Sequence, residues 1–299
     1  MHIDNRVTGE TRFVGLIGNP VEHSISPQLH NTISSCLGVD LIYIPFKVEG
    51  AGLKDAVNGL KALNTAGFNV TIPYKKDIMK YIDENSKEAL LMGAVNTVKN
   101  IDGRLYGYNT DAEGFSRAFK EETGEGFKGK KIVIIGAGGA ARAITVKIAI
   151  EGAAEISIIN RTLSKAHDIA DIIANNYSMH AGCFGTDEDK AGDVLKHADI
   201  IINTTSIGMY PKTNESPLKK RIKLSGQQIV YDIIYNPSMT KLLAGARRHG
   251  AKAVNGLGML FYQGIYAYEI WTGIKIPKDA LKHIHESFEN ILKNKGFKP

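Results

Sequence analysis

Cysteine is scarce in this chain of 299 residues, where it occurs only at Cys36 and Cys183. Two cysteines so far apart give neither the spacing of a structural zinc site nor the density of a disulfide-stabilised secreted domain. Histidine does not supply a metal site instead. His23 and His30 lie close together in the sequence, but no third ligand follows them at a suitable spacing. The sequence therefore predicts no metal site.

Long hydrophobic runs are also absent. Arg142 and Lys147 interrupt the best candidate for a membrane-spanning segment. The first residues, Met-His-Ile-Asp-Asn-Arg, lack the order of positive charge followed by apolar residues that marks a secretion signal. We therefore expect a cytoplasmic protein with no membrane partner.

The positive charge is not clustered, although the formal net charge is +6. Basic residues are scattered along the chain, and the one tight group, at 219–221, is typical of a solvated turn. This pattern predicts no nucleic-acid partner. A mildly basic surface instead suits a small anionic substrate.

Glycine is concentrated in the most informative stretch, which follows four β-branched residues at 132–135. An apolar run, a glycine-rich turn and then an alanine-rich segment predict a buried parallel strand, a tight turn and a helix. Gly136 permits the turn, and Gly138 lets a pyrophosphate approach the helix N-terminus. Ala141 replaces the third glycine of the usual pattern. The alternative is the same turn without a nucleotide. The residues predicted to bind a cofactor here are Gly136, Ala137, Gly138, Gly139 and Ala140.

Strand and helix patterns alternate on both sides of this turn. Asp102-Gly103 predicts a hairpin turn between strands at 94–98 and 105–108. The fold class is therefore α/β, with an N-terminal mixed-sheet domain followed by a Rossmann dinucleotide-binding domain. Other strands are expected at 13–18, 40–46, 67–73, 155–159, 199–203, 228–233 and 251–254, and helices at 26–37, 53–63, 74–81, 86–91, 112–123, 164–175, 260–271 and 278–293.

A set of motifs in one order resembles the shikimate dehydrogenase family. The motifs are Ser24-Ile-Ser26-Pro27, Asn69-Val-Thr71-Ile-Pro73-Tyr-Lys75, Gly93-Ala-Val-Asn96-Thr, Tyr108-Asn109-Thr110-Asp111, the glycine turn, Asn160-Arg161-Thr162, Asn203-Thr204-Thr205, Tyr231-Asp232 with Tyr235, and Gly256-Leu-Gly258-Met259 with Gln263. The resemblance implies NADPH-dependent, reversible reduction of 3-dehydroshikimate to shikimate in the biosynthesis of chorismate and aromatic amino acids. It also implies a substrate-binding domain at 1–111, completed by C-terminal helices at 256–299, a Rossmann domain at 112–255, and an active site in the cleft between them.

The resemblance assigns catalysis to Lys75 and Asp111. Hydride transfer to a ketone needs a proton donor at the developing alkoxide, and a lysine beside an aspartate stays charged and oriented for that task. Without the flanking motif, Lys75 would be better interpreted as a solvated surface lysine, like its neighbour Lys76. Taken alone, Asp111 reads equally as a helix N-cap.

The substrate residues are neutral hydrogen-bonding groups. Ser24 and Ser26 are alternate residues in an extended turn, and two hydroxyl donors suit a carboxylate. Ser26 followed by Pro27 is also typical of a helix N-cap, and the two roles are compatible. The resemblance places Tyr235 near the carboxylate and assigns the ring hydroxyls to Asn69, Thr71, Asn96 and Gln263.

The second strand of the Rossmann pattern ends without a carboxylate. NAD-binding units commonly place Asp or Glu there to hold the ribose 2′-hydroxyl, whereas Arg161 suits a 2′-phosphate. NADP is therefore the expected cofactor. Lys165 stands where many family members carry a second arginine, which leaves NAD open. The remaining residues of the predicted cofactor site are Asn160, Thr162, Lys165, Thr204, Gly256 and Met259.

Two other functions remain open at this point. One is a quinate/shikimate dehydrogenase that uses NAD, and the other is a non-catalytic nucleotide- or metabolite-binding relative. The expected partner is a small-molecule substrate, and the chain is expected to be a monomer or a homodimer.

Overall fold

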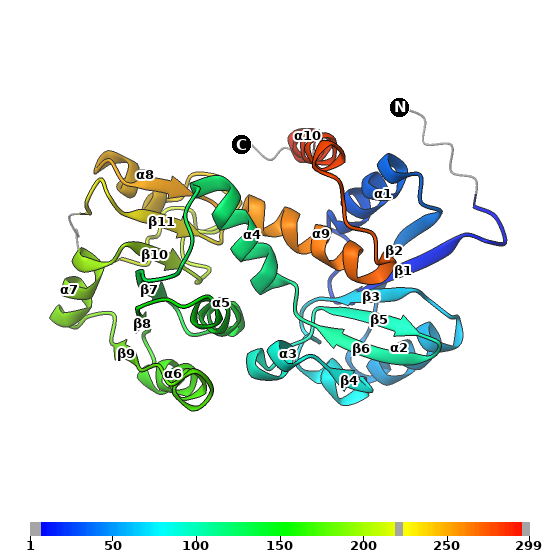
Figure 1. The fold of residues 1–299 in the computed structure, drawn as a ribbon, viewed down its shortest axis with the longest axis horizontal. Helices are drawn as coiled ribbons and strands as arrows, with labels where there is room; N and C mark the ends of the chain where they lie inside the picture. Colours follow the sequence, from blue (N-terminus) through cyan, green and yellow to red (C-terminus); the bar gives the residue numbers. More distant parts are fainter. Residues whose placement is uncertain (1–6, 219–223, 295–299) are drawn as a thin grey trace. The chain divides into compact units, whose positions relative to one another are not determined.

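The computed structural model of the protein describes residues 7–218 and 224–294. These residues form two compact units, one of 7–110 with 263–294 and one of 111–262 apart from 219–223. Helix α9 (Leu257–Thr272) starts in the second unit and ends in the first (Figure 1). The basic cluster at 219–221, predicted as a solvated turn, lies outside the described residues.

The first unit contains a six-stranded mixed sheet in the order β2-β1-β3-β5-β6-β4. β1 runs parallel to β2 and β3, whereas β5 runs antiparallel to β3 and β6. Asp102 and Gly103 both have positive φ, which confirms the predicted hairpin turn. The strands are β1 (Arg12–Gly18), β2 (Leu41–Lys47), β3 (Gly67–Val70), β4 (Glu84–Asn85), β5 (Thr97–Ile101) and β6 (Arg104–Tyr108).

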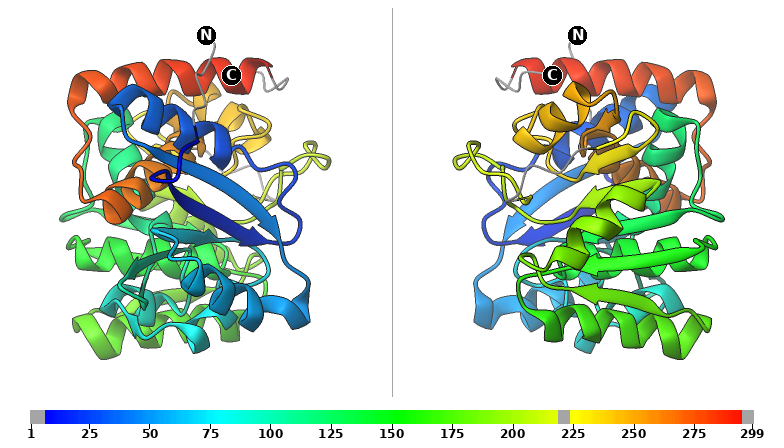
Figure 2. Two further views of the ribbon diagram at one scale, coloured as in Figure 1. Left: turned by 90° about the vertical axis from the view of Figure 1, so that its right-hand side faces the viewer. Right: turned by 90° about the vertical axis from the view of Figure 1, so that its left-hand side faces the viewer.

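Helices cover this sheet because its strands bury apolar side chains on both faces. Phe68 and Val98 belong to one buried cluster with α2 (Leu53–Ala62), η2 (Asp77–Tyr81) and α3 (Lys87–Met92). Gly67, the residue before Phe68, leaves room for Trp271 of α9, whose Nε1 donates 2.9 Å to the backbone oxygen of Val98. Helix α10 (Lys278–Asn294) packs along α1 (Ser26–Leu37), as Figure 2 shows.

The second unit contains a parallel sheet in the order β12-β11-β10-β7-β8-β9. This is the strand order of the Rossmann fold, with the reversal between β7 and β10, where ligands bind at the carboxyl ends of the strands. Continuous β-branched runs form the central strands because both of their faces are buried. The strands are β7 (Lys131–Ile135), β8 (Glu155–Ile159), β9 (Ala181–Phe184), β10 (Ile200–Asn203), β11 (Ile229–Asp232) and β12 (Lys252–Val254).

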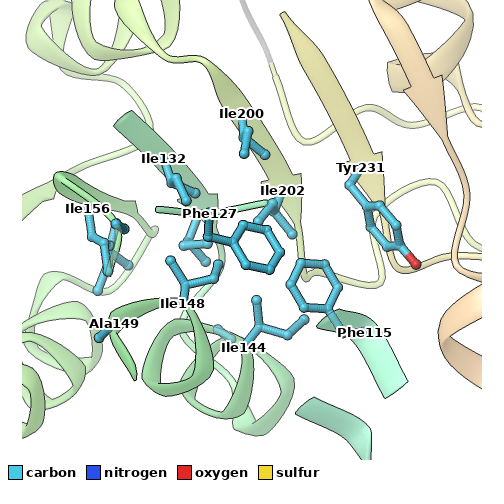
Figure 3. Packing of buried hydrophobic residues seen from close by; sticks show 14 of the residues in the cluster. Phe115, Phe127, Ile132, Ile144, Ile148, Ala149, Ile156, Ile200, Ile202 and Tyr231 are labelled. Atoms are coloured by element: carbon cyan, nitrogen blue, oxygen red, sulfur yellow. The ribbon is translucent and has the colours of Figure 1, made fainter. Parts of the chain in front are cut away.

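Two buried clusters hold the helices against this sheet. Figure 3 shows the first, in which Phe115 of α4 (Asp111–Thr123) and Ile144 of α5 (Gly139–Ile150) pack on Ile202 of β10. Helix α6 (Leu163–Tyr177) joins the same cluster through Ile169. In the second cluster, α7 (Asp189–His197) and α8 (Lys241–Arg248) pack around Val230 of β11.

Several local elements differ from the sequence prediction. The helix expected at 74–81 is a turn followed by the 3₁₀ helix η2, and the backbone oxygen of Lys75 accepts from the amide of Val95 rather than from a helical partner. Strands β4 and β9 and helices α7 and α8 were not expected. β9 is only half-buried and starts with Ala181-Gly182, so it carries no strong apolar pattern.

Candidate functional site

The glycine turn between β7 and α5 leaves open space beside the helix N-terminus. Gly136 has φ 109°, and a Cβ there would lie 2.7 Å from Oγ1 of Thr204, so only glycine fits. At Gly138 and Gly139 a Cβ would meet no atom within 4 Å. No side chain caps α5 at its N-cap, Gly138. The predicted turn, which includes Ala137 and Ala140, therefore presents helix N–H groups to an accessible space, as pyrophosphate binding requires.

The carboxyl end of β8 lies beside this turn, because the amide of Gly136 donates 2.8 Å to the backbone oxygen of Ile159. Asn160 follows, and its side chain is held by a 2.8 Å hydrogen bond to the backbone oxygen of Thr162. This strand end carries no carboxylate to repel a 2′-phosphate. The side chains predicted to recognise that phosphate, Arg161, Thr162 and Lys165, are all exposed.

A buried network closes the ends of β10 and β11. The Asp232 carboxylate accepts hydrogen bonds from Asn203 Nδ2 at 2.9 Å and Thr240 Oγ1 at 2.7 Å, and from the amide of Ile234. The side-chain oxygen of Asn203 accepts from the amide and hydroxyl of Thr205. Burial raises the pKa of Asp232 to about 6, against the opposing effect of these hydrogen bonds. The network fixes the loop that begins at the predicted cofactor residue Thr204.

Gly256 lies against the end of β11. A Cβ at this position would lie only 1.9 Å from the backbone oxygen of Ile233, so the close packing of two backbone segments demands glycine. Met259, the third residue of α9, is half-buried and packs against the first cluster of the second unit. Tyr235 follows β11 and is 36% exposed.

In the first unit, Lys75 lies in the turn after β3. Tyr74 is buried, and its hydroxyl donates 2.6 Å to the backbone oxygen of Val48, which anchors the turn. The backbone oxygen of Lys75 accepts 2.8 Å from the amide of Val95. The Lys75 side chain is half-buried, whereas that of Lys76 is exposed. The structure therefore distinguishes the two adjacent lysines as the sequence motif does.

Asn96, the residue after Val95, hydrogen-bonds Thr110 at the end of the first unit. Its side-chain oxygen accepts 2.7 Å from the amide of Thr110, and its Nδ2 donates 3.0 Å to the hydroxyl of Thr110. Asp111, the next residue, is the first of α4. Residues 95 and 96 thus hold both the backbone of Lys75 and the residue that precedes Asp111.

Asn69 is buried at the end of β3, and its side-chain amide makes several hydrogen bonds within the protein. Its Nδ2 donates 3.0 Å to the backbone oxygen of Asn96 and 2.9 Å to the hydroxyl of Thr97, and its Oδ1 accepts 2.9 Å from the hydroxyl of Tyr43. Both amide hydrogens are therefore occupied, so Asn69 can offer a ligand only its oxygen.

Ser24 and Ser26 lie at the start of α1, and both are half-buried. The hydroxyl of Ser24 accepts 3.2 Å from the amide of Ser26. The prediction that Ser26 is the N-cap is wrong, because Ile25 occupies that position and makes no side-chain cap. Ser26 is instead the first residue of α1.

Thr71 and Gln263, the other two predicted substrate residues of this unit, are half-buried. The amide of Thr71 donates 2.9 Å to the backbone oxygen of Ile17, which keeps Thr71 beside β1. Gln263 precedes Gly264 on α9, where a Cβ would come within 2.6 Å of Leu29 of α1. The lack of a side chain at Gly264 brings the helix backbone that carries Gln263 close to α1.

Two residues in these networks were not singled out by the sequence. Tyr43 lies on a buried face of β2, and a buried tyrosine hydroxyl normally needs a partner, which is the signal that could have indicated it. Thr240 is the N-cap of α8, where it accepts from the amide of Leu243, and the N-cap rule could have found it.

Within residues 7–218 and 224–294, no three His, Cys, Asp or Glu side chains are grouped to hold a metal ion. His30 is buried and stacks on Tyr43 with ring centroids 4.4 Å apart. No helix in the described part of the chain is long and apolar enough to cross a membrane.

The fold and these residues define a class of protein. A Rossmann unit has an open glycine turn, and an attached mixed α/β unit carries a half-buried lysine among neutral polar groups. Together they are typical of oxidoreductases that bind a nicotinamide dinucleotide.

The chain belongs to the shikimate dehydrogenase family, as the sequence predicts. The model of the shikimate dehydrogenase substrate binding domain matches residues 16–98. The model of shikimate / quinate 5-dehydrogenase matches residues 118–235, and that of the shikimate 5′-dehydrogenase C-terminal domain matches 256–283.

Individual relatives agree with this assignment. The shikimate dehydrogenase (NADP(+)) of Methanocaldococcus jannaschii is 47% identical over 279 residues, which cover 93% of this chain and 97% of that protein. The crystal structure of shikimate 5-dehydrogenase from Listeria monocytogenes in complex with shikimate and NAD has a TM-score of 0.90 at 41% identity, with 95% of this chain and 99% of that chain covered. A shikimate dehydrogenase solved in complex with NADP+ has a TM-score of 0.83 at 45% identity, with 93% and 96% covered.

Proposed function

We propose that this chain catalyses the reversible reduction of 3-dehydroshikimate to shikimate with NADPH, as a step in the biosynthesis of chorismate and aromatic amino acids. The observation that carries the proposal is the placement of Lys75. Its backbone is held by Val95, and the adjacent Asn96 holds Thr110, the residue before Asp111. This arrangement sits in a chain that is 47% identical to a shikimate dehydrogenase (NADP(+)).

Lys75 and Asp111 are the proposed catalytic pair. The Lys75 ammonium donates a proton to the carbonyl oxygen of 3-dehydroshikimate as that oxygen becomes an alkoxide, and it takes the proton back in the reverse reaction. Asp111 orients the lysine, and it accepts a hydrogen bond from a ring hydroxyl. The half-buried setting of Lys75 limits the number of positions that its ammonium can adopt.

The substrate carboxylate is assigned to the two serines at the start of α1, with Tyr235 as a further neighbour. The hydroxyls of Ser24 and Ser26 are suitable donors for an anion that accepts several hydrogen bonds. The ring hydroxyls are assigned to Asn69, Thr71, Asn96 and Gln263. Residues 1–111 and 256–299 accordingly form the proposed substrate domain.

Residues 112–255 form the proposed NADP domain. When bound, the nicotinamide supplies the hydride. The accessible start of α5 binds the pyrophosphate, and the exposed guanidinium of Arg161 pairs with the 2′-phosphate. Thr204, Gly256 and Met259 complete the cofactor site beside the ends of β10 and β11. The NADP(+) in the printed names of the relatives supports this assignment.

The free thiols of Cys36 and Cys183 are in keeping with a cytoplasmic enzyme. The small-molecule substrate is the proposed partner, and the enzyme acts as a monomer or a homodimer.

The proposal is tested by following the absorbance of the reduced nicotinamide with shikimate or quinate and with NADP+ or NAD+. We expect the highest kcat/KM for shikimate with NADP+. A higher value for quinate with NAD+ would identify a quinate dehydrogenase instead. No turnover with either substrate would identify a non-catalytic relative.

A further inference from the structure

A chain of hydrogen bonds runs from the end of β11 to the loop after β10. The Asp232 carboxylate accepts 2.9 Å from Nδ2 of Asn203. The Oδ1 of Asn203 accepts 2.7 Å from the hydroxyl of Thr205 and 3.1 Å from its amide. The Thr205 hydroxyl in turn accepts 3.2 Å from the amide of Ile207. Asp232 and Asn203 are fully buried, so their bond is shielded from competing water.

The donors and acceptors in this chain determine how the Asn203 amide is oriented. A charged carboxylate can only accept, so the nitrogen of Asn203 must face Asp232. Its oxygen then faces Thr205, whose amide can only donate. The other carboxylate oxygen of Asp232 accepts 2.7 Å from the hydroxyl of Thr240. Asp232 therefore fixes the direction of the Asn203 oxygen, and this oxygen holds Thr205.

The loop that is held in this way lies against the glycine turn. A Cβ at Gly136 would lie 2.7 Å from Oγ1 of Thr204 and 2.9 Å from Cγ2 of Thr205. Thr204 is also fixed to the end of β7, because its hydroxyl donates 2.7 Å to the backbone oxygen of Ile135. A shift of Thr205 would therefore change the space beside the turn that is proposed to bind the pyrophosphate.

The loop belongs to one half of the proposed dinucleotide site. In a Rossmann fold each half of the sheet holds one mononucleotide, and the dinucleotide crosses the crevice where the strand order reverses. Arg161, proposed to pair with the 2′-phosphate of the adenosine half, follows β8. The loop at 204–207 follows β10, on the other side of the reversal. It therefore belongs to the half that holds the nicotinamide nucleotide.

We infer that Asp232 and Asn203 are positioning residues for the nicotinamide half of NADP. Through Thr205 they hold the loop after β10 beside the glycine turn, in the arrangement that this half of the cofactor meets. The inference rests on the proposed function. It assigns the two halves of the cofactor to different residues, because Arg161 acts on the adenosine half alone.

Thr205→Val tests the inference by removing the hydroxyl while it keeps the shape of the side chain. We expect the Kd values for NADP+ and NAD+ to rise by the same factor, roughly threefold to tenfold, as the loss of one hydrogen bond implies. Adenosine 2′,5′-bisphosphate contains only the adenosine half and its 2′-phosphate, so its Kd should not change. Thr205→Ser restores the hydroxyl and should return the Kd for NADP+ to the wild-type value. Calorimetric titration measures all three ligands.

Asp232→Asn tests the other end of the chain. Burial raises the pKa of Asp232 to about 6, so at pH 8 the carboxylate is charged and holds Asn203 by a charge-assisted hydrogen bond. The substitution removes the charge, and we expect the Kd for NADP+ to rise about threefold. The Kd for adenosine 2′,5′-bisphosphate should again not change. In the double variant with Thr205→Val, the rise should be smaller than the product of the two single rises.

Gln228→Leu is the matched control for a purely structural effect. Gln228 is buried immediately before β11, at the opposite end of this strand from Asp232. Its Nε2 donates 2.8 Å and 2.7 Å to the backbone oxygens of Leu195 and Ala198. We expect this variant to have a lower Tm and an unchanged Kd for NADP+. A rise in this Kd equal to that in Thr205→Val would show that lost stability alone weakens binding, and it would overturn the inference.

The inference would also be overturned by an unchanged Kd for NADP+ in Thr205→Val, or by an equal rise for adenosine 2′,5′-bisphosphate. If Thr205→Val does not fold, Asp232→Asn decides by the same criteria. A wild type that binds NADP+ without turning over shikimate would overturn the proposed function, and the same titrations would still decide the inference. A wild type that does not bind NADP+ would overturn both.

Discussion

The backbone amide of Thr110 donates a hydrogen bond of 2.7 Å to the side-chain oxygen of Asn96. The amide of Val95, one residue earlier, donates 2.8 Å to the backbone oxygen of Lys75. Two adjacent residues therefore fix the chain at Lys75 and at the residue before Asp111. The proposed proton donor and its carboxylate are both tied to the start of β5, and this relation leads to the first prediction.

Replacing Lys75 by alanine should remove the proton path. We expect kcat with shikimate to fall by about 10²–10⁴-fold, the usual contribution of general acid–base catalysis, while NADP+ still binds. The matched control is Lys76→Ala, because Lys76 is the exposed neighbour, and this variant should have a nearly unchanged kcat. Steady-state kinetics and a cofactor titration measure both effects. Near-normal kcat in Lys75→Ala would contradict the assignment.

The Asp111→Asn variant should also have a lowered kcat, because the substitution keeps the shape of the side chain but removes the charge beside the lysine. The double mutant Lys75→Ala/Asp111→Asn should lose less than the product of the two single losses, because the two groups act as a unit. Independent, fully multiplicative losses would show that the pair does not act together.

Arg161→Ala should weaken NADP+ binding and spare NAD+. The guanidinium is exposed at the end of β8, where a 2′-phosphate can pair with it, and NAD+ lacks that phosphate. A loss of one hydrogen-bonded charge contact is worth about 1.5–3 kcal/mol, which is roughly a tenfold or greater rise in Kd. Titration of both cofactors checks this result. Equal losses for NADP+ and NAD+ would count against the assignment.

Ser24→Ala and Ser26→Ala should each raise the KM for shikimate by about tenfold or more, since a hydrogen bond to a charged group is worth roughly 1.5–3 kcal/mol. The contact is remote from the reacting carbon, so kcat should change less. Kinetics with the cofactor held at saturation separates the two constants. An unchanged KM in both variants would refute the carboxylate assignment.

Gly256→Ala should destabilise the fold. The added Cβ would lie 1.9 Å from the backbone oxygen of Ile233, so two backbone segments must separate. Overpacking of this kind costs about 1–3 kcal/mol and lowers Tm by several degrees. Gly126→Ala is the control, because a Cβ there meets nothing within 4 Å. Thermal unfolding of both variants measures the difference, and equal Tm values would contradict the packing argument.

Asp232 should make stability depend on pH. Burial raises its pKa from 3.8 to about 6 in the folded protein, so the folded state binds this proton more tightly than the unfolded state. The carboxylate therefore destabilises the fold above pH 6, and this penalty is relieved as the pH falls from about 6 towards 4. The full effect is roughly 3 kcal/mol.

Asp232→Asn supplies the reference, because it keeps the side-chain shape without the titration. The free energy of unfolding of the wild type, minus that of Asp232→Asn, should rise as the pH is lowered from 7 to 4.5. Denaturant unfolding at each pH measures this difference. A difference that stays flat, or that falls with pH, would show that the Asp232 carboxyl is not perturbed in this direction.

The sequence by itself determined the Rossmann unit and the family. The two central strands of the second sheet, β7 and β10, are buried on both faces and are continuous runs of β-branched residues. The neighbouring strand β8 was predicted at the bounds that the structure shows, Glu155–Ile159. The glycine turn was also predicted from local residues. The structure shows why glycine is required there, because Gly136 has φ 109° and no other residue fits beside Thr204. Such signals are local, and local patterns are readable from one chain.

Only the tertiary structure decided which polar groups meet. Tyr43 and Asn69 lie on β2 and β3, which are separate in the sequence, and their 2.9 Å hydrogen bond exists only because β1 brings these two strands together in the sheet. The sequence suggested that Ser26 caps α1, but Ile25 takes that position. β9 escaped prediction for the related reason that its stability comes from pairing with β8, since its own half-buried residues carry little apolar pattern.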